Sequence, residues 1–177
     1  MIKDLPWSDP VRLSQLSHEP VRRTLTADEA ARGRIAKALE LDELLELTAE
    51  VEATRWLDGA QVAGRWKARV LQTCGVTLDP FESLLGGDFQ LRAVPEGSAA
   101  APEPPVGEQA PLDPEAEDPP DVLGEDRLDL AAYVVEHLAL EVDPYPRKPG
   151  VEFEPPEAEP EVSPFAVLKN LKLPGAS

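Results

Sequence analysis

The sequence predicts an α+β domain: a curved antiparallel sheet of about four to six strands, two main helices and a short C-terminal helix. Three observations predict this fold. Apolar and polar residues alternate through 45–54, the pattern of a strand with one face in water. Residues 27–39 and 129–140 carry apolar side chains at helical spacing. Two acidic, proline-rich stretches, at about 95–125 and 151–162, separate or follow these elements.

Length and composition favour one domain with a small core. The chain has 177 residues, 20 of them proline, and only 5% are aromatic. We expect a single domain over residues 1–150.

The net charge is −17, but residues 93–126 hold ten acidic residues and no basic one, and 151–162 hold five more acidic residues. Without these fifteen, 19 acidic residues face 17 basic ones. The remainder is nearly neutral, so its charge does not exclude binding to nucleic acid.

Cysteine content and hydropathy favour a location in the reducing cytoplasm. Cys74 is the one cysteine, so no disulfide can form within the chain. No segment resembles a signal peptide, and no run of about 18 apolar residues could cross a bilayer. We expect a cytoplasmic protein with no membrane partner.

The N-terminal part predicts an extended strand followed by a helix. Apolar residues between prolines, including Val11 and Leu13, indicate the strand. Thr26 and Glu29 then fit a capping box, with a hydroxyl at the N-cap and a carboxylate three residues later. A helix over 27–39 follows.

The strand at 45–54 predicts a hairpin, because Asp58 and Gly59 form a typical two-residue turn. A turn centred there pairs residues whose numbers sum to 117, which matches apolar with apolar side chains and acids with bases. The predicted pairs are Val51 with Trp66, Ala49 with Ala68, Leu47 with Val70, Glu52 with Arg65 and Glu50 with Lys67. Trp66 is expected in the core.

A third strand and a long loop follow the hairpin. Phe89, Leu91 and Ala93 alternate with polar residues and predict the strand, which Pro95 ends. The stretch from Pro95 to Asp126, both included, holds eight prolines and ten acidic residues, and such a composition buries too little apolar surface to order itself. We expect a disordered acidic loop at about 95–125, inside the domain.

A second helix, over 129–140, has a clear cap and a clear end. Asp129 can cap it, and Leu130, Val134 and Leu138 form one apolar stripe. Pro144 and Pro146 stop it, since a proline disfavours helix in the residue before it.

The C-terminal segment at 163–173 reads as a short docking helix beyond the acidic linker 151–162. Pro164 suits a first helical position, and Phe165, Leu168 and Leu171 lie close to one stripe. About nine residues are too few for a stable free helix. We expect docking through Phe165 and Leu168, either on the chain's own sheet or on a partner.

Three pieces of the sequence, in this order and spacing, resemble the YceD family, also called large ribosomal RNA subunit accumulation proteins. The first stands where that family has Cys-x-x-Cys-Leu-Glu-Pro and reads Cys-Gly-Val-Thr-Leu-Asp-Pro over 74–80. The second leads into a helix that ends at prolines, and the third is the terminal Pro-Phe-Ala segment. The matching residues are Cys74, Leu78, Pro80 and Phe81, then Asp126, Asp129, Leu130, Pro144 and Pro146, and finally Pro164, Phe165, Leu168 and Lys169. The resemblance spans roughly the whole chain.

The resemblance implies a non-enzymatic bacterial factor needed for large-subunit ribosomal RNA to accumulate. The chain departs from the family pattern at Thr77, which stands where the second cysteine is expected, and it lacks the later Cys and His that often follow Pro146. One thiolate and two distant histidines fall short of the four ligands of a structural zinc site. We therefore expect no cofactor and no metal.

Candidate RNA contacts lie on the hairpin and near the C-terminus. They are Arg65, Lys67, Arg69, Arg147, Lys148, Lys169 and Lys172. The first three project from one face of a strand, where acids across the ladder could equally make them an ordinary solvated face. A catalytic alternative pairs Cys74 as nucleophile with His137, although a lone cysteine after a strand is more often a small buried residue.

Two function hypotheses stay open. In the first, the chain supports synthesis, processing or accumulation of large-subunit ribosomal RNA, with ribosomal RNA or a pre-ribosomal particle as partner. In the second, it is an adaptor whose acidic loop and terminal helix bind a basic ribosomal protein or an assembly factor. The acidic loop could also mimic phosphates and cover the basic strip, or simply act as a solubilising linker.

Overall fold

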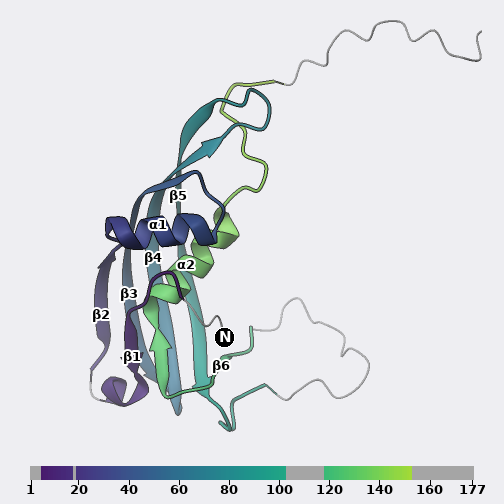
Figure 1. Cartoon of the computed structure of the whole chain (residues 1–177). Helices are drawn as coiled ribbons and strands as arrows, with labels where there is room; N and C mark the ends of the chain where they lie inside the picture. Colours follow the sequence, from purple (N-terminus) through teal and green to yellow (C-terminus); the bar gives the residue numbers. More distant parts are fainter. Residues whose placement is uncertain (1–4, 18, 103–117, 153–177) are drawn as a thin grey trace, which may run out of the picture.

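The computed structural model describes residues 5–17, 19–102 and 118–152. They form a five-stranded sheet, a second sheet of two strands, two α-helices and one 3-10 helix (Figure 1). The main sheet has the order β2-β3-β4-β5-β6, with bounds Val21–Thr26, Glu43–Trp56, Gly59–Thr73, Pro80–Pro95 and Asp121–Leu123. The small sheet pairs β1 (Pro10–Arg12) with β7 (Arg127–Asp129), and the helices are η1 (Leu13–Ser17), α1 (Glu29–Ala38) and α2 (Leu130–Glu141). The predicted α+β class is confirmed.

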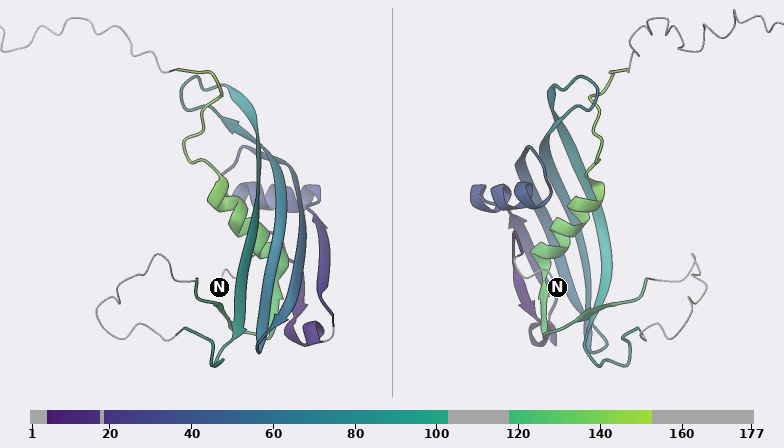
Figure 2. Two further views of the ribbon diagram at one scale, coloured as in Figure 1. Left: turned by 180° about the vertical axis from the view of Figure 1, so that it is seen from behind. Right: turned by 45° about the vertical axis from the view of Figure 1, so that its right-hand side comes forward.

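Both α-helices cover one face of the main sheet and leave the other face open, as the two further views in Figure 2 show. We call these the inner and the outer face. The alternation of buried and exposed residues along β3 and β4 follows from this arrangement, because only the inner face meets the helices.

The sheet is antiparallel from β2 to β5, but β6 runs parallel to β5, which corrects the prediction of a purely antiparallel sheet. β6 also lies within 95–125, where the sequence predicts no structure. Ala93 pairs with Asp121, and the Glu96 N–H donates to the Leu123 carbonyl at 3.1 Å. A parallel neighbour needs a connection of a dozen or more residues, and the acidic stretch provides that length. Its middle part, 103–117, lies outside the described residues.

The β3–β4 hairpin exists, but its predicted register is wrong by two residues. From Glu46 to the turn, opposed residues sum to 115: Trp56 faces Gly59 and Glu50 faces Arg65. The turn therefore centres on Leu57 and Asp58, with Leu57 at a φ of 52°. Gly59 is needed for a different reason, because a Cβ there would lie 2.0 Å from the Ala93 carbonyl oxygen. A shift of two residues keeps every side chain on its face, so polarity matching could not detect the error.

A bulge interrupts the alternation at the start of β3. The register shifts between Leu44 and Glu46, so Leu44 is 2% exposed while Leu45, predicted on the apolar face, is only half-buried. A bulge adds one unpaired residue, so the side chains before it lie on the opposite face of the sheet from the one that simple alternation predicts.

Helix α1 begins two residues later than the capping box predicts. Asp28 is the N-cap, and its carboxylate accepts a hydrogen bond of 2.7 Å from the Ala31 N–H. Thr26 cannot serve as cap because it pairs with Thr48 as the last residue of β2.

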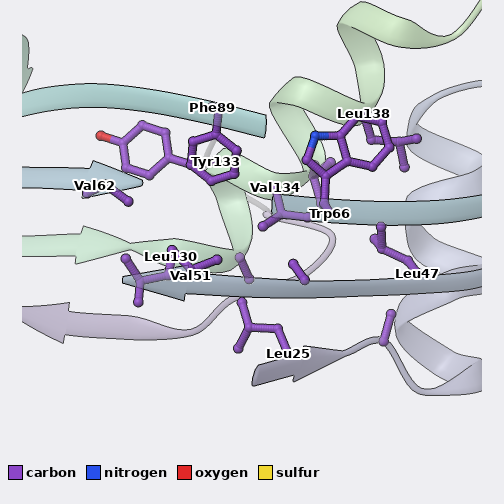
Figure 3. Close-up of a cluster of buried hydrophobic side chains, with 14 of the residues drawn as sticks. Leu25, Leu47, Val51, Val62, Trp66, Phe89, Leu130, Tyr133, Val134 and Leu138 are labelled. Carbon is purple, nitrogen blue, oxygen red and sulfur yellow. The ribbon is translucent and has the colours of Figure 1, made fainter. Parts of the chain in front are cut away.

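Helix α2 matches its prediction and supplies much of the core. Leu130, Val134 and Leu138 are fully buried, and Asp129 is the N-cap. Figure 3 shows Val134 and Leu138 of this stripe beside Trp66, which is 2% exposed, as predicted for a core residue. Phe89 packs over Gly64, where a Cβ would lie 2.4 Å from the ring.

The small sheet was not predicted as such. The N-terminal stretch forms only a three-residue strand, β1, before η1, and Val11 in it faces Leu128 of β7. Both side chains are buried, at 1% and 0% exposure. The N-terminal strand β1 is thereby joined to residues more than a hundred positions later in the chain. The predicted helix at 163–173 and the linker residues after Glu152 lie outside the described residues.

Candidate functional site

Asp129 joins the N-terminal strand to helix α2. One of its oxygens, Oδ1, accepts hydrogen bonds from the Asp9 N–H at 2.9 Å and from the Ala132 N–H at 3.2 Å. The other oxygen accepts from the Ser8 hydroxyl. In the same region the carbonyl of Asp126 accepts from the Leu13 N–H at 3.4 Å. These two acidic motif residues therefore have structural contacts, and Leu130 beside them is fully buried.

The first motif piece forms the loop that joins β4 to β5. The Cys74 N–H donates to the Asp79 carbonyl and the Leu78 N–H donates to the Cys74 carbonyl, both at 2.9 Å. Leu78 has a φ of 62°, in the left-handed region that residues other than glycine seldom adopt. Pro80 opens β5 opposite Thr73, at a position where a missing N–H is tolerated.

The second motif piece is clamped onto this loop. The Gly75 N–H donates to the Pro146 carbonyl at 2.9 Å, and the Lys148 N–H donates to the Cys74 sulfur at 3.4 Å. A third bond, from the Gln72 side-chain amide to the Asp143 carbonyl at 3.3 Å, holds the start of the same tail. We call this contact between residues 74–79 and 143–148 the clamp. Sequence reasoning grouped these residues by family pattern alone, and the structure brings them into contact.

The Cys74 thiol is buried within the clamp, as predicted for a small apolar residue, but its surroundings are polar. The N–H of Lys148, then the N–H and hydroxyl of Thr77 and the N–H of Val76, lower the pKa of Cys74 from 9.0 to about 6. Burial acts in the opposite direction and is the smaller effect. Thr77, at the position of the missing cysteine, thus helps to lower the pKa of this thiol.

The described residues contain no group of three or more His, Cys, Asp and Glu side chains placed to hold a metal ion. Within those same residues no helix is long and apolar enough to span a membrane.

Cys74 and His137, the pair of the catalytic alternative, are far apart. The His137 ring packs edge-on against Phe89 with the ring centroids 4.4 Å apart. Phe89 lies nine residues along β5 from Pro80, which is roughly 30 Å of strand. A nucleophile and its base must lie within hydrogen-bond reach, so this pair is ruled out as a catalytic unit in this structure.

The basic strip, which consists of Arg65, Lys67 and Arg69 on β4, lies on the outer face, and two of its three members are ion-paired. Arg65 contacts Asp88 at 2.6 Å, and this carboxylate raises the pKa of the Arg65 guanidinium. Arg69 contacts Glu82 at 3.3 Å and Glu46 at 3.9 Å. The acids predicted opposite the strip were Glu52 and Glu50. The two-residue register error explains why Glu46 lies opposite Arg69, whereas Asp88 and Glu82 come from the neighbouring strand β5.

Glu52 instead contacts Arg22 on the neighbouring strand, at 3.1 Å. Arg22 and Asp88 were missed by sequence reasoning, because each meets its partner only through the order of strands in the sheet. Together with Arg65 they border an open hollow of about 770 Å³ on the outer face. Phosphate groups would have to displace carboxylates to bind these arginines.

The remaining candidate RNA contacts lie elsewhere. Lys67 is exposed between Thr48 and Gly86, and it makes no ion pair within the described part of the chain. Arg147 and Lys148 are exposed in the clamp, at one end of the sheet. Lys169 and Lys172, like Pro164, Phe165 and Leu168, lie outside the described residues.

The YceD family model, described as "Large ribosomal RNA subunit accumulation protein YceD", matches residues 62–172. The matched region begins within β4 and includes both halves of the clamp. No curated protein and no solved structure matches the chain.

Proposed function

The chain belongs to the YceD family, since the match covers more than half of it, and from this premise we propose that it is a non-enzymatic factor for large-subunit ribosomal RNA. It would support the synthesis, processing or accumulation of that RNA in the cytoplasm, during ribosome biogenesis. The observation that carries the proposal is the family match, which includes the two motif pieces joined in the clamp. Those motif residues hold the fold together, which suits a binding factor better than a catalyst.

Direct RNA binding is part of this proposal. Lys67 on the outer face, and Arg147 and Lys148 in the clamp, are exposed cations that could contact phosphates. Arg65 and Arg69 would contribute only if phosphates replaced Asp88 and Glu82. A solvent-exposed ion pair contributes roughly 0–1 kcal/mol to stability, so replacing its carboxylate by a phosphate costs little free energy.

The test is complementation in cells depleted of the protein, read as the ratio of large-subunit to small-subunit ribosomal RNA. The full chain should restore the ratio, and the Lys67→Glu/Arg147→Glu/Lys148→Glu variant should not. Arg12→Glu, an exposed charge reversal on β1 outside the candidate contacts, serves as the control. If the triple variant restores the ratio as well as the full chain does, direct contact through these cations is refuted.

A second candidate is an adaptor that binds a basic large-subunit ribosomal protein or an assembly factor. The observation in its favour is the outer face, where Arg22, Arg65 and Arg69 all contact carboxylates. The excess of acidic residues in the sequence also favours a basic partner. Any effect on RNA would then be indirect.

Crosslinking in growing cells, followed by denaturing purification of the tagged full chain, separates the two candidates. The first predicts recovered large-subunit RNA, and the second predicts mainly one basic protein.

A deletion of 103–117 tests the acidic segment while keeping β6, which starts at Asp121. If RNA affinity and its dependence on salt stay unchanged without this segment, it does not compete with RNA for the basic residues.

A further inference from the structure

The clamp has an apolar hollow on its surface. The hollow measures about 500 Å³, and the β4–β5 loop and the tail after α2 both line it. Its apolar lining residues are Val76, Leu78, Pro144, Tyr145 and Pro146. The hydrogen bonds from Gly75 to Pro146 and from Lys148 to Cys74 hold its two walls together, so the hollow is built by the fold.

Two large side chains of this lining are left in water. Leu78 is 76% exposed and Tyr145 is 79% exposed, although both belong to one hollow. Leu78 is held in this position by a backbone at positive φ, which the bond from its N–H to the Cys74 carbonyl closes. Grouped exposed apolar side chains in a concave site are typical of a surface that binds an apolar partner.

A suitable partner lies a short way along the same chain. The described part ends at Glu152, just after the Val151 N–H donates to the Lys148 carbonyl at 3.3 Å beside the hollow. The next ten residues, 153–162, can span up to about 35 Å when extended. Residues 163–172 then carry Phe165, Leu168 and Leu171 at helical spacing. A tether this short gives an effective concentration near the millimolar range.

We propose that residues 163–172 bind in the hollow of the clamp, with Phe165 and Leu168 against Leu78 and Tyr145. A segment of this length cannot hold a helix alone in water, and the hollow supplies the apolar surface it needs. The family match extends to residue 172 and so includes both the hollow and its occupant. This inference does not depend on RNA binding.

Hydrogen exchange on the purified full chain tests the proposal. The amides of 163–172 should exchange at least about tenfold slower in the wild type than in the Leu78→Ser/Tyr145→Ser variant. Both replaced side chains are largely exposed, so the rest of the fold should keep its exchange pattern. Leu84→Ser is the matched control: Leu84 is 82% exposed but lies outside the hollow, and its loss should leave 163–172 protected.

A photoreactive residue at position 165 provides a second measurement that is independent of folding effects. Its crosslinks should map to residues 76–78 and 144–146 within one molecule. Four results would overturn the proposal: no protection of 163–172 in the purified chain, protection that depends on protein concentration, protection that survives Leu78→Ser/Tyr145→Ser, or crosslinks to another surface. The second would assign the hollow to another copy of the chain.

Discussion

Replacing Asp129 with alanine removes three hydrogen bonds at the point where the N-terminal strand meets helix α2. The lost N-cap bond to Ala132 should cost about 1 kcal/mol. The N–H of Asp9, which is partly buried, loses its partner at 2.9 Å, and such a loss costs about 1–3 kcal/mol. The bond from the exposed Ser8 adds little. We therefore expect the free energy of unfolding to fall by about 2–4 kcal/mol.

Asp28→Ala is the matched control for this prediction. Among the described residues, Asp28 caps α1 through one side-chain bond to Ala31 and joins no second element, so its loss should cost only about 1 kcal/mol. Asp129→Asn keeps an oxygen acceptor and should stay within about 1 kcal/mol of the wild type. Urea unfolding of the three full-length variants and the wild type, followed by circular dichroism, gives the free energies. Equal losses for Asp129→Ala and Asp28→Ala would refute the idea that Asp129 ties the N-terminal strand to the helix.

Further predictions concern the turn, the thiol and the outer face. Leu57→Gly should stabilise the fold by about 1 kcal/mol in urea unfolding, because glycine adopts a φ of 52° without strain, and a loss of stability would contradict this. Gly59→Ala should destabilise by at least about 2 kcal/mol in the same assay, since its Cβ would meet the Ala93 carbonyl; a neutral result would show that the backbone yields. The pKa of Cys74 is lowered to about 6, so between pH 6 and 9 the folded chain binds fewer protons than the unfolded chain. The stability of the wild type relative to Cys74→Ala should therefore rise with pH across this window and be lost below about pH 6, and a difference that is flat with pH would exclude a thiolate in the clamp. Lys67→Glu should leave stability within about 0.5 kcal/mol, and if this side of the sheet contacts phosphates, it should lower the salt slope of RNA affinity by about 1.

Much of the fold follows from local sequence patterns. The alternation after Leu44 predicts β3 and its inner face, and the stripe of Leu130, Val134 and Leu138 predicts α2 together with its cap. The helix α1 was predicted with the wrong cap, because Thr26 satisfies the pattern equally well and only pairing with Thr48 excludes it. Local patterns thus identify elements better than their ends.

The candidate site was predictable only in part. The family pattern singled out Cys74 and Pro146, yet nothing in their residue types indicates that Gly75 and Lys148 would donate backbone bonds between the two pieces. Backbone N–H and carbonyl groups are common to nearly all residues, so bonds between them leave no mark on the sequence. The outer-face ion pairs are similar, because Asp88 meets Arg65 only once β5 lies beside β4.

The sequence by itself determined that the long strands β3, β4 and β5 and the helices α1 and α2 form, which face of β3 and of α2 is apolar, and which family the chain resembles. These properties depend on residues close together in the chain, where side-chain spacing records the period of the backbone. Only the tertiary structure decided the register of the β3–β4 hairpin, the parallel placement of β6, the pairing of β1 with β7, and the clamp around Cys74. Each of these joins distant residues through backbone bonds, or chooses between registers two residues apart that place every side chain on the same face.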